Sequence, residues 1–401
     1  MKIAIVSDLH LGYERFAEDA YRQAKEALEA ASIMADAIII PGDIFDKRAP
    51  KPDAIAEAIN IFRELSRKEW KASAEMRGAK TAFTNVPILA IPGTHERTSA
   101  GKENALKLLG LAGMLIDISE STAVISNGKE KVAIFGLGGI SDERVKEKLK
   151  ELDPKPIDGM YNIFLFHQSV YELLPFNSDF IKYEDLPVGF DLYVDGHIHN
   201  PVEAKAHGKP FLIPGSTVLT QMKDAEQGSK GFILVDTKDS SHEIIPINSR
   251  KFFSIRLNFE DSSTPHILEK CETALSQIIT KSASKPIVKV HLEGTMQAGL
   301  QFGSLNLKPI LSKYGRDAFI EIDQSKLTIP ELAKSIEDMR ENRIGDLPIK
   351  DLGASFMNAK LKELNFDKSI DVSRLFELLD EPAQSKKQKT VDEALKFLNA
   401  L

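Results

Sequence analysis

The first ten residues, MKIAIVSDLH, join a short apolar run to two polar side chains, Asp8 and His10. Residues 2–6 predict a buried strand, and the polar pair stands where that strand ends. The same arrangement follows at 37–43, AIIIPGD, where a second apolar run leads through a glycine to Asp43. Helical patterns separate these runs, so the sequence predicts a mainly parallel sheet that is covered on both faces.

The rest of the chain extends this pattern and then changes character near Ser249. Strands are predicted at 87–91, 132–135, 162–166 and 192–194, helices at 16–31 and from Pro52, and a closing antiparallel portion at 211–213 and 231–235. Alternating strand and helix patterns follow at 251–259, 265–280, 286–292, 304–313 and 318–322. Charged helical patterns continue from Thr328. We therefore expect three parts: 1–248, 249–325 and 326–401.

Composition excludes several classes of protein. Over 401 residues the chain is 42% hydrophobic and 28% charged, which is typical of a soluble globular protein. Its single cysteine, Cys271, leaves no internal disulfide and no Cys-based metal site, as expected of a cytoplasmic protein. The opening apolar run is too short for a signal peptide, and no stretch is long enough to span a membrane. A net charge of −7 argues against a protein that coats nucleic acid, but local basic patches would still permit a nucleic-acid enzyme.

Polar side chains gather in the turns that follow the predicted strands, and five of the nine histidines lie there. The candidate site residues in these turns are Asp8, His10, Asp43, Asp46, Thr94, His95, His167, His197 and His199. Because ligands of open α/β sheets collect at the carboxyl ends of the strands, we expect these turns to meet in one place. Each turn alone is more typical of a capped or solvated loop, and only the ordered set favours chemistry.

The kinds of side chain in this set point to a pair of metal ions. Aspartate and histidine without cysteine favour Mn, Fe or Zn over Ca or Mg. There are more such groups than one tetrahedral ion requires, whereas two ions about 3.5–4 Å apart, bridged by one carboxylate, would use them. A pair of this kind activates a water molecule and holds both the attacking and the leaving oxygen of a phosphate ester.

The ordered set resembles the calcineurin-like metallophosphoesterases, whose pattern is Asp-x-His, Gly-Asp, Gly-Asn-His-Asp/Glu, a lone His and Gly-His-x-His. The resemblance covers roughly the first 245 residues. Within that superfamily the chain is similar to the DNA double-strand-break repair nucleases of the meiotic-recombination-eleven or SbcD type. The segments that carry this similarity are 8–14, 42–46, 165–169, 196–199 and 214–216.

The resemblance implies a fold, an activity and partners. The fold would be an α/β layered sandwich of mainly parallel sheets flanked by helices, with a smaller α/β capping domain as a DNA-binding platform. The activity would be that of a 3′-to-5′ exonuclease and endonuclease with two Mn²⁺ ions per subunit. The partners would be DNA, a second copy of the chain and an ABC-type coiled-coil ATPase.

The resemblance also implies roles for individual residues. Asp8, His10, Asp43 and His199 would hold the first metal, and Asp43, His167 and His197 the second. Thr94 stands where the family has an Asn that ligates the second metal, which leaves this site weaker. His95 matches the catalytic histidine. Asp46 stands where the family places a residue that can polarise this histidine, with helix capping as the alternative.

Basic residues near the metal-bearing turns are candidates for contacts with DNA phosphates. They are Arg15, Lys47, Arg48, Lys51, Arg97 and Lys102, and for each of them a solvated charged surface is the alternative. Two apolar stripes, at 55–65 and 106–111, either cover a sheet or pack across a two-fold axis. Apolar faces at 375–379 and 391–398 are candidates for binding the ATPase.

Two other functions remain open from the sequence. A phosphatase or small-molecule phosphodiesterase would use the same metals, although a small substrate needs no capping platform. A non-catalytic scaffold subunit would keep the fold without the chemistry, but the retention of the aspartates and histidines argues against it.

Overall fold

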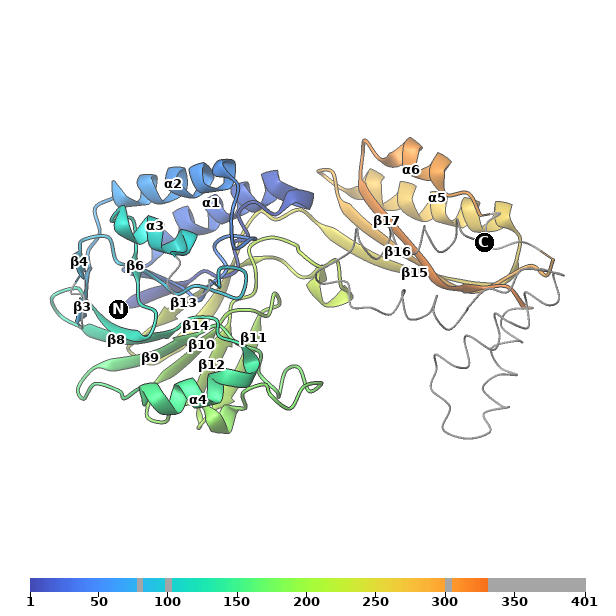
Figure 1. Ribbon diagram of the computed structural model, residues 1–401. Helices are drawn as coiled ribbons and strands as arrows, with labels where there is room; N and C mark the ends of the chain where they lie inside the picture. The colour runs from blue at the N-terminus through green and yellow to red at the C-terminus, as the bar shows by residue number, and fades with distance from the viewer. Residues whose placement is uncertain (78–81, 98–102, 300–304, 331–401) are drawn as a thin grey trace, which may run out of the picture. The chain divides into compact units, whose positions relative to one another are not determined.

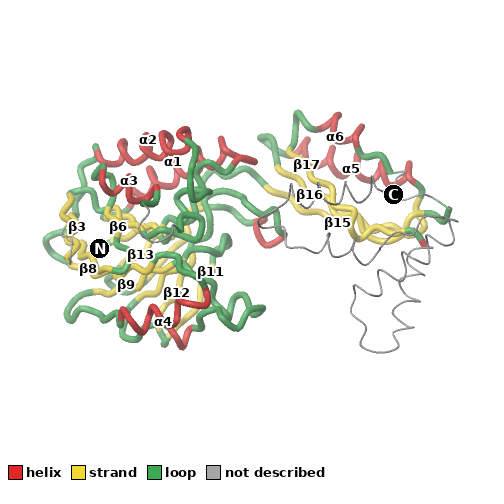
Figure 2. Tube along the Cα trace, in the orientation of Figure 1, coloured by secondary structure: helices red, strands yellow, loops and turns green. Residues whose placement is uncertain are grey.

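The computed structural model describes residues 1–77, 82–97, 103–299 and 305–330 (Figure 1). Two large β-sheets with helices on their outer faces form the first part of the chain, and a three-stranded sheet with two helices follows (Figure 2). The α/β class and the layered sandwich are therefore confirmed. Lys102 and the apolar faces at 375–379 and 391–398 lie outside the described residues.

The first sheet has six strands in the order β14-β13-β1-β2-β5-β6. Its parallel strands are β1 (Lys2–Ile5), β2 (Ala37–Ile40), β5 (Ile88–Ala90) and β6 (Ile116–Asp117). The antiparallel edge consists of β13 (Gly231–Asp236) and β14 (Ser241–Pro246). The helices of its outer face are α1 (Ala17–Met34), α2 (Pro52–Ser66) and α3 (Ala105–Leu111).

The second sheet has eight strands in the order β11-β12-β10-β9-β8-β7-β3-β4. Its parallel centre consists of β8 (Lys131–Leu137), β9 (Tyr161–Phe166), β10 (Leu192–Asp195) and β12 (Lys209–Ile213). Antiparallel strands at its edges are β3 (Ser73–Arg77), β4 (Ala82–Thr84), β7 (Ser121–Ser126) and β11 (Val202–Ala206). Helix α4 (Asp142–Leu152) packs on its outer face. The expected antiparallel closure is correct for 231–235, whereas 211–213 also pairs in parallel with β10.

The two sheets pack face to face, so each is covered by the other sheet on one face and by helices on the other. Alternate residues of each strand point in opposite directions. Ile3 and Ile5 of β1 join Ile163 and Leu165 of β9 in a core between the sheets. Each fully buried side chain of this kind stabilises the fold by about 1.5–3 kcal/mol. A strand that is buried on both faces has the same apolar sequence whether a helix or a sheet covers it, so the sequence could not distinguish the two.

The apolar stripes of α2 and α3 cover the first sheet. In α2, Ala58, Phe62 and Leu65 are fully buried in the core beneath the helix. In α3, Leu106 and Leu109 are buried as well. Packing across a two-fold axis stays a prediction.

The part after β14 contains the predicted alternation of strands and helices. The strands β15 (Phe252–Ser262), β16 (Ile287–Met296) and β17 (Phe319–Thr328) form one sheet in sequence order, with helices α5 (Thr264–Lys281) and α6 (Lys308–Tyr314) between them in the chain. The chain divides into two compact units at 256, 270, 291, 307 and 323, so the division passes through all three strands. The predicted domain boundary at 249 therefore remains a prediction.

No helix in the described ranges has both the length and the apolar character needed to cross a bilayer.

Candidate active site

The polar turns of both sheets lie against one another at the carboxyl ends of their strands. The Asp8 amide donates to the Gly42 carbonyl (3.2 Å), and the His10 amide donates to the Asp43 carbonyl (3.0 Å). Gly42 has a φ of 102°, and a Cβ atom at this position would overlap the ring of His167. Only glycine allows the turn after β2 to approach the turn after β9 so closely. The turns of the two sheets thus meet, as the sequence predicts.

Four of the candidate ligands have a left-handed backbone conformation. The φ angles are 51° at Asp8, 47° at His10, 51° at Asp43 and 69° at His197. Such angles cost roughly 1–2 kcal/mol at a residue with a side chain, and they tend to cluster at functional sites. The fold therefore retains strained turns at the positions whose side chains carry the candidate chemistry.

The first group of ligand atoms consists of Asp8, His10 and His199. The two Nε2 atoms of His10 and His199 are 3.2 Å apart. Asp8 Oδ1 is 3.8 Å from Nε2 of His10 and 3.7 Å from Nε2 of His199. Two ligands of a single ion at about 2.0–2.2 Å stand roughly 3–3.5 Å apart, so this triangle fits one ion after a small contraction.

The second group consists of Asp8, Asp43 and His167, whose ligand atoms all lie within 4.8 Å of one another. Nε2 of His167 is 3.3 Å from Asp43 Oδ2. Nδ1 of the same ring is 2.6 Å from the Pro41 carbonyl, to which it donates its hydrogen. Burial lowers the pKa of His167, but the charge of Asp43 outweighs it and raises this pKa to about 10, so without a cation Nε2 is protonated. A bound cation would replace that proton and use the lone pair of Nε2, while Nδ1 keeps its hydrogen bond to Pro41.

Unpaired polar atoms in this place support cation binding. Asp8 Oδ1 and His167 Nε2 are buried, and neither has a hydrogen-bond partner among the described residues. Leaving such atoms unsatisfied costs about 1–3 kcal/mol each, and a bound cation would remove that cost. Because Asp8 occurs in both groups and Asp43 lies beside both, two ions could share a carboxylate here.

The pKa values of Asp43 and His197 suit cation binding. Burial raises the pKa of Asp43, but the charge of His167 outweighs it and holds this pKa well below its usual range. Burial, followed by the charge of His167, lowers the pKa of His197 to about 3. The carboxylate is therefore ionised and this imidazole neutral at pH 7, the forms in which both bind metals.

His197 lies beside the second group rather than inside it. Its ring centroid is 5.3 Å from that of His167, and its Nε2 is 3.2 Å from the Ser169 hydroxyl. Thr94 faces the Asp43 carboxylate, because its hydroxyl oxygen is 3.4 Å from Asp43 Oδ2. The residues predicted for the second metal thus lie in the same neighbourhood, and their role as ligands stays a prediction.

His95 is exposed at the edge of the first group, with its ring centroid 5.0 Å from that of His10. Its Nδ1 is 2.5 Å from the backbone carbonyl of Asp46. The carboxylate of Asp46 faces His10 instead, 3.3 Å from Nδ1 of that ring. Asp46 thus contacts His95 through its main chain and His10 through its side chain. The N-cap of α2 is Lys51, so Asp46 does not cap this helix.

Glu96 contributes to the site although the sequence suggested no role for it. Its buried carboxylate accepts hydrogen bonds from the amides of Phe45 (2.9 Å) and Gly93 (3.0 Å), which joins the turns after β2 and β5. Burial, together with the nearby Asp43, raises the pKa of Glu96 to about 7. The one feature of the sequence that could have indicated this role is that Glu96 directly follows His95 in the segment Gly-Thr-His-Glu (93–96).

The basic residues proposed for DNA contacts mostly have partners within the protein. Lys47 and Lys51 both pair with Glu14 at 2.9 Å, and Arg15 pairs with Glu321 at 2.7 Å. Arg48 donates to the backbone carbonyl of Arg97, and the Arg97 guanidinium donates to the Ile140 carbonyl. DNA contacts by these residues stay a prediction.

Comparison with known proteins gives relatives in archaea and plants. The chain is 28% identical over 332 residues to the "DNA double-strand break repair protein Mre11" of Archaeoglobus fulgidus, covering 74% of this chain and 69% of that protein. It is 24% identical over 315 residues to the protein of the same name from Sulfolobus acidocaldarius, covering 74% and 76%. The "Double-strand break repair protein MRE11" of Arabidopsis thaliana is 25% identical over 445 residues, covering 89% and 61%.

The model of one protein family, the calcineurin-like phosphoesterases, matches residues 1–201. This segment is half of the chain, and it contains every candidate metal ligand from Asp8 to His199. The expected superfamily is thereby confirmed, and so is the expected class of enzyme. The chain belongs to the calcineurin-like phosphoesterase family of metal-dependent hydrolases.

Proposed function

We propose that this enzyme is a DNA nuclease that processes DNA ends in double-strand-break repair with two Mn²⁺ ions. The observation that carries the proposal is a set of overlapping ligand groups in which Asp8 and Asp43 each occur twice, with buried atoms that lack partners among the described residues. Similarity to proteins named for double-strand-break repair supports DNA as the substrate. A 3′-to-5′ exonuclease on duplex ends and an endonuclease on single strands are the proposed activities.

The proposal distributes these residues between two ions. Asp8, His10 and His199 would hold the first, His167 and His197 the second, and Asp43 would lie between them. When bound there, Mn²⁺ would supply Lewis-acid chemistry, which activates water for attack and offsets the charge that develops on the phosphate. The chain's part is to hold the ligands in place, with Asp46 orienting the His10 ring and Pro41 orienting the His167 ring.

His95 is the proposed catalytic residue that does not bind metal. The hydrogen bond from Nδ1 to the Asp46 carbonyl fixes the ring and leaves Nε2 free for substrate. From there a protonated ring can donate to a phosphate oxygen, or give its proton to the leaving oxygen. The exposure of His95 suits this role, because the group must reach a substrate that arrives from solvent.

The proposed partners are DNA, a second copy of the chain and an ABC-type ATPase. Similarity to proteins named for DNA double-strand-break repair supports DNA, and the resemblance to the double-strand-break repair nucleases implies the other two. Residues 249–325 would serve as the DNA platform, and 326–401 would bind the ATPase.

The test of this function is a digestion assay with end-labelled linear duplex DNA, in which Mn²⁺, Mg²⁺ and Zn²⁺ are compared. We expect Mn²⁺-dependent release of nucleotides from the 3′ ends, and cleavage of single-stranded circles in a parallel reaction. A simple phosphomonoester serves as the competing substrate. Rapid turnover of the monoester with intact DNA would contradict the proposal and identify a phosphatase.

Replacing Thr94 with Asn should strengthen the second metal site. The Thr94 hydroxyl lies 3.4 Å from Asp43 Oδ2, and an Asn side chain would reach further and offer a carbonyl oxygen. We expect Thr94→Asn to lower the Mn²⁺ concentration for half-maximal activity by roughly tenfold, the lower end of the range for changes around a metal site. Titration of activity with Mn²⁺ measures the effect, with Thr280→Asn on the exposed face of α5 as control. Superimposable curves for Thr94→Asn and the native chain would mean that the site is already complete.

A further inference from the structure

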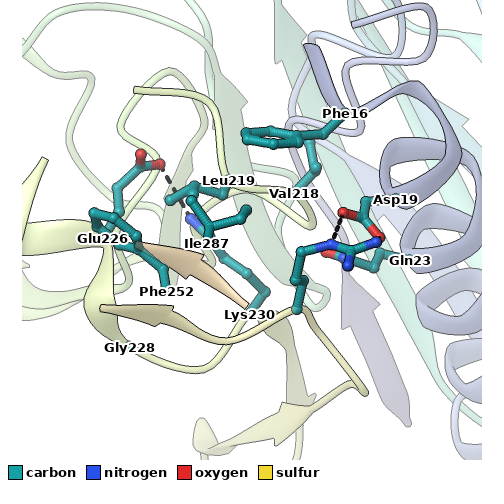
Figure 3. A pocket seen from close by; sticks show the side chains of 11 residues that line it. Phe16, Asp19, Gln23, Val218, Leu219, Glu226, Gly228, Lys230, Phe252 and Ile287 are labelled. Carbon is teal, nitrogen blue, oxygen red and sulfur yellow. Dashed lines mark hydrogen bonds and ion pairs between the residues drawn. The ribbon is translucent and has the colours of Figure 1, made fainter. Parts of the chain in front are cut away.

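A buried ion pair lies behind His199, in the loop that follows β12. Glu226 belongs to a short 3-10 turn (Asp224–Gln227), and Lys230 follows it four residues later. Their side chains are only 3% and 6% exposed, and Lys230 Nζ is 3.2 Å from Glu226 Oε1. Figure 3 shows this pair as a dashed contact beside Leu219. Burying two charges is costly, so the pair calls for an explanation.

A chain of contacts joins this pair to the His199 ring. Nδ1 of His199 is hydrogen-bonded to the Thr220 hydroxyl, and that hydroxyl donates to Glu226 Oε1 at 3.5 Å. The other oxygen of Glu226 accepts from the Gln221 amide at 2.8 Å. The Glu226 carboxylate is thus held by the loop's own backbone while it faces Thr220.

The hydrogens of this chain of contacts have a defined direction. A threonine hydroxyl has one hydrogen, and an ionised carboxylate can only accept. The Thr220 hydrogen therefore points to Glu226, and the Thr220 oxygen accepts from Nδ1–H of His199. A neutral imidazole with its hydrogen on Nδ1 has a lone pair on Nε2. Nε2 of His199 is the atom that lies 3.7 Å from Asp8 Oδ1 in the first metal group.

We infer that Glu226, acting through Thr220, sets the tautomer of His199 and thereby the affinity of the first metal site. The inference rests on the proposed function in one respect, because it takes His199 as a metal ligand. Without the carboxylate, the Thr220 hydroxyl is free to donate to Nδ1, which places the hydrogen on Nε2. That hydrogen would point at the metal position and block it. Thr220 and Glu226 are positioning residues, since neither touches the metal position.

Other contacts hold this arrangement in place without the Thr220 hydroxyl. Lys230 donates to the backbone carbonyl of His199 (3.1 Å) and to the Ser216 hydroxyl (2.9 Å). The Thr220 carbonyl accepts from the Tyr13 hydroxyl at 2.6 Å. Thr220→Val therefore removes the hydroxyl while the main-chain contacts of the loop remain.

The test uses three substitutions in the full-length protein. Thr220→Val removes the hydroxyl, Thr220→Ser keeps it, and Glu226→Gln replaces the carboxylate. Thr217→Val is the control, because Thr217 is a buried threonine of the same loop and its hydroxyl has no hydrogen-bond partner among the described residues. The His199 tautomer is read from the ring ¹⁵N shifts of metal-free, ¹⁵N-histidine-labelled protein, and Mn²⁺ affinity is measured by calorimetry.

We expect Nδ1–H at His199 in the native chain, in Thr220→Ser and in Thr217→Val. Thr220→Val and Glu226→Gln should show Nε2–H in part or in full, and should bind the tighter Mn²⁺ ion roughly 10- to 100-fold more weakly. An Nε2–H tautomer in the native chain, or native Mn²⁺ affinity in Thr220→Val, would overturn the inference. If Glu226→Gln does not fold, the two Thr220 variants still test whether the hydroxyl sets the His199 tautomer. Since neither readout uses DNA, an inactive nuclease with the expected tautomers would contradict only the proposed function.

Discussion

Replacing His95 with Gln should abolish most DNA hydrolysis while leaving metal binding unchanged. The His95 ring is exposed, and its Nδ1 is engaged by the Asp46 carbonyl, which leaves Nε2 to act on the substrate. Loss of a group that donates a proton or stabilises developing charge lowers turnover by about 10²-fold or more. Single-turnover kinetics on end-labelled duplex DNA, together with elemental analysis of Mn²⁺ content, measure both quantities in one preparation.

A loss of bound Mn²⁺ in His95→Gln would contradict the proposed role of His95 and identify it as a metal ligand. A ligand atom of His95 lies within 4.8 Å of ligand atoms of His10 and Asp43, so the ring could bind an ion itself. A fall in Mn²⁺ stoichiometry in His95→Gln would show that it does. His266→Gln, at an exposed histidine of α5, is the control and should match the native chain in both measurements.

Asp43→Asn should remove both catalysis and one of the two metal ions. Asp43 accepts from the His95 amide at 2.9 Å and faces His167 Nε2 at 3.3 Å, so it links the catalytic turn to the second ligand group. Asn has the same shape and can keep the bond from the His95 amide, but it loses the charge that holds a cation. We expect turnover to fall about 10³-fold or more, at or beyond the upper end for loss of one electrostatic contact.

Calorimetric titration with Mn²⁺ measures the second part of this prediction. The native chain should bind two ions, and Asp43→Asn at most one. Asp158→Asn changes an exposed aspartate and controls for the altered net charge. Two ions bound with native affinity in Asp43→Asn would show that Asp43 is not the shared ligand.

The sequence predicted the strands that carry the site and the turns that meet there. Each of these strands is a continuous apolar run, and a polar turn follows it within a few residues, as at Asp8 and Asp43. The antiparallel strands β7 and β11 escaped prediction because they are half-exposed and mix polar with apolar residues. The stacking of the two sheets was expected from the family resemblance alone, since burial on both faces looks the same in sequence whether a helix or a sheet covers the strand.

Contacts between distant side chains were the other part that the sequence could not supply. Nothing in the pattern around Thr220 and Glu226 shows that they lie behind His199, because no periodicity extends through this loop. Asp46 was expected to act on His95 through its carboxylate, but the backbone turns that group toward His10. Lys47 and Lys51 were judged by their charge alone, and their shared partner Glu14 lies more than thirty residues earlier in the chain.

The central claim of two ions that share Asp43 is tested most directly by anomalous X-ray diffraction from crystals loaded with Mn²⁺. We predict two anomalous peaks about 3.5–4 Å apart. One should lie among Asp8, His10 and His199, the other beside His167, with an oxygen of Asp43 in contact with both. A single peak, or two peaks of which only one touches Asp43, would contradict the account.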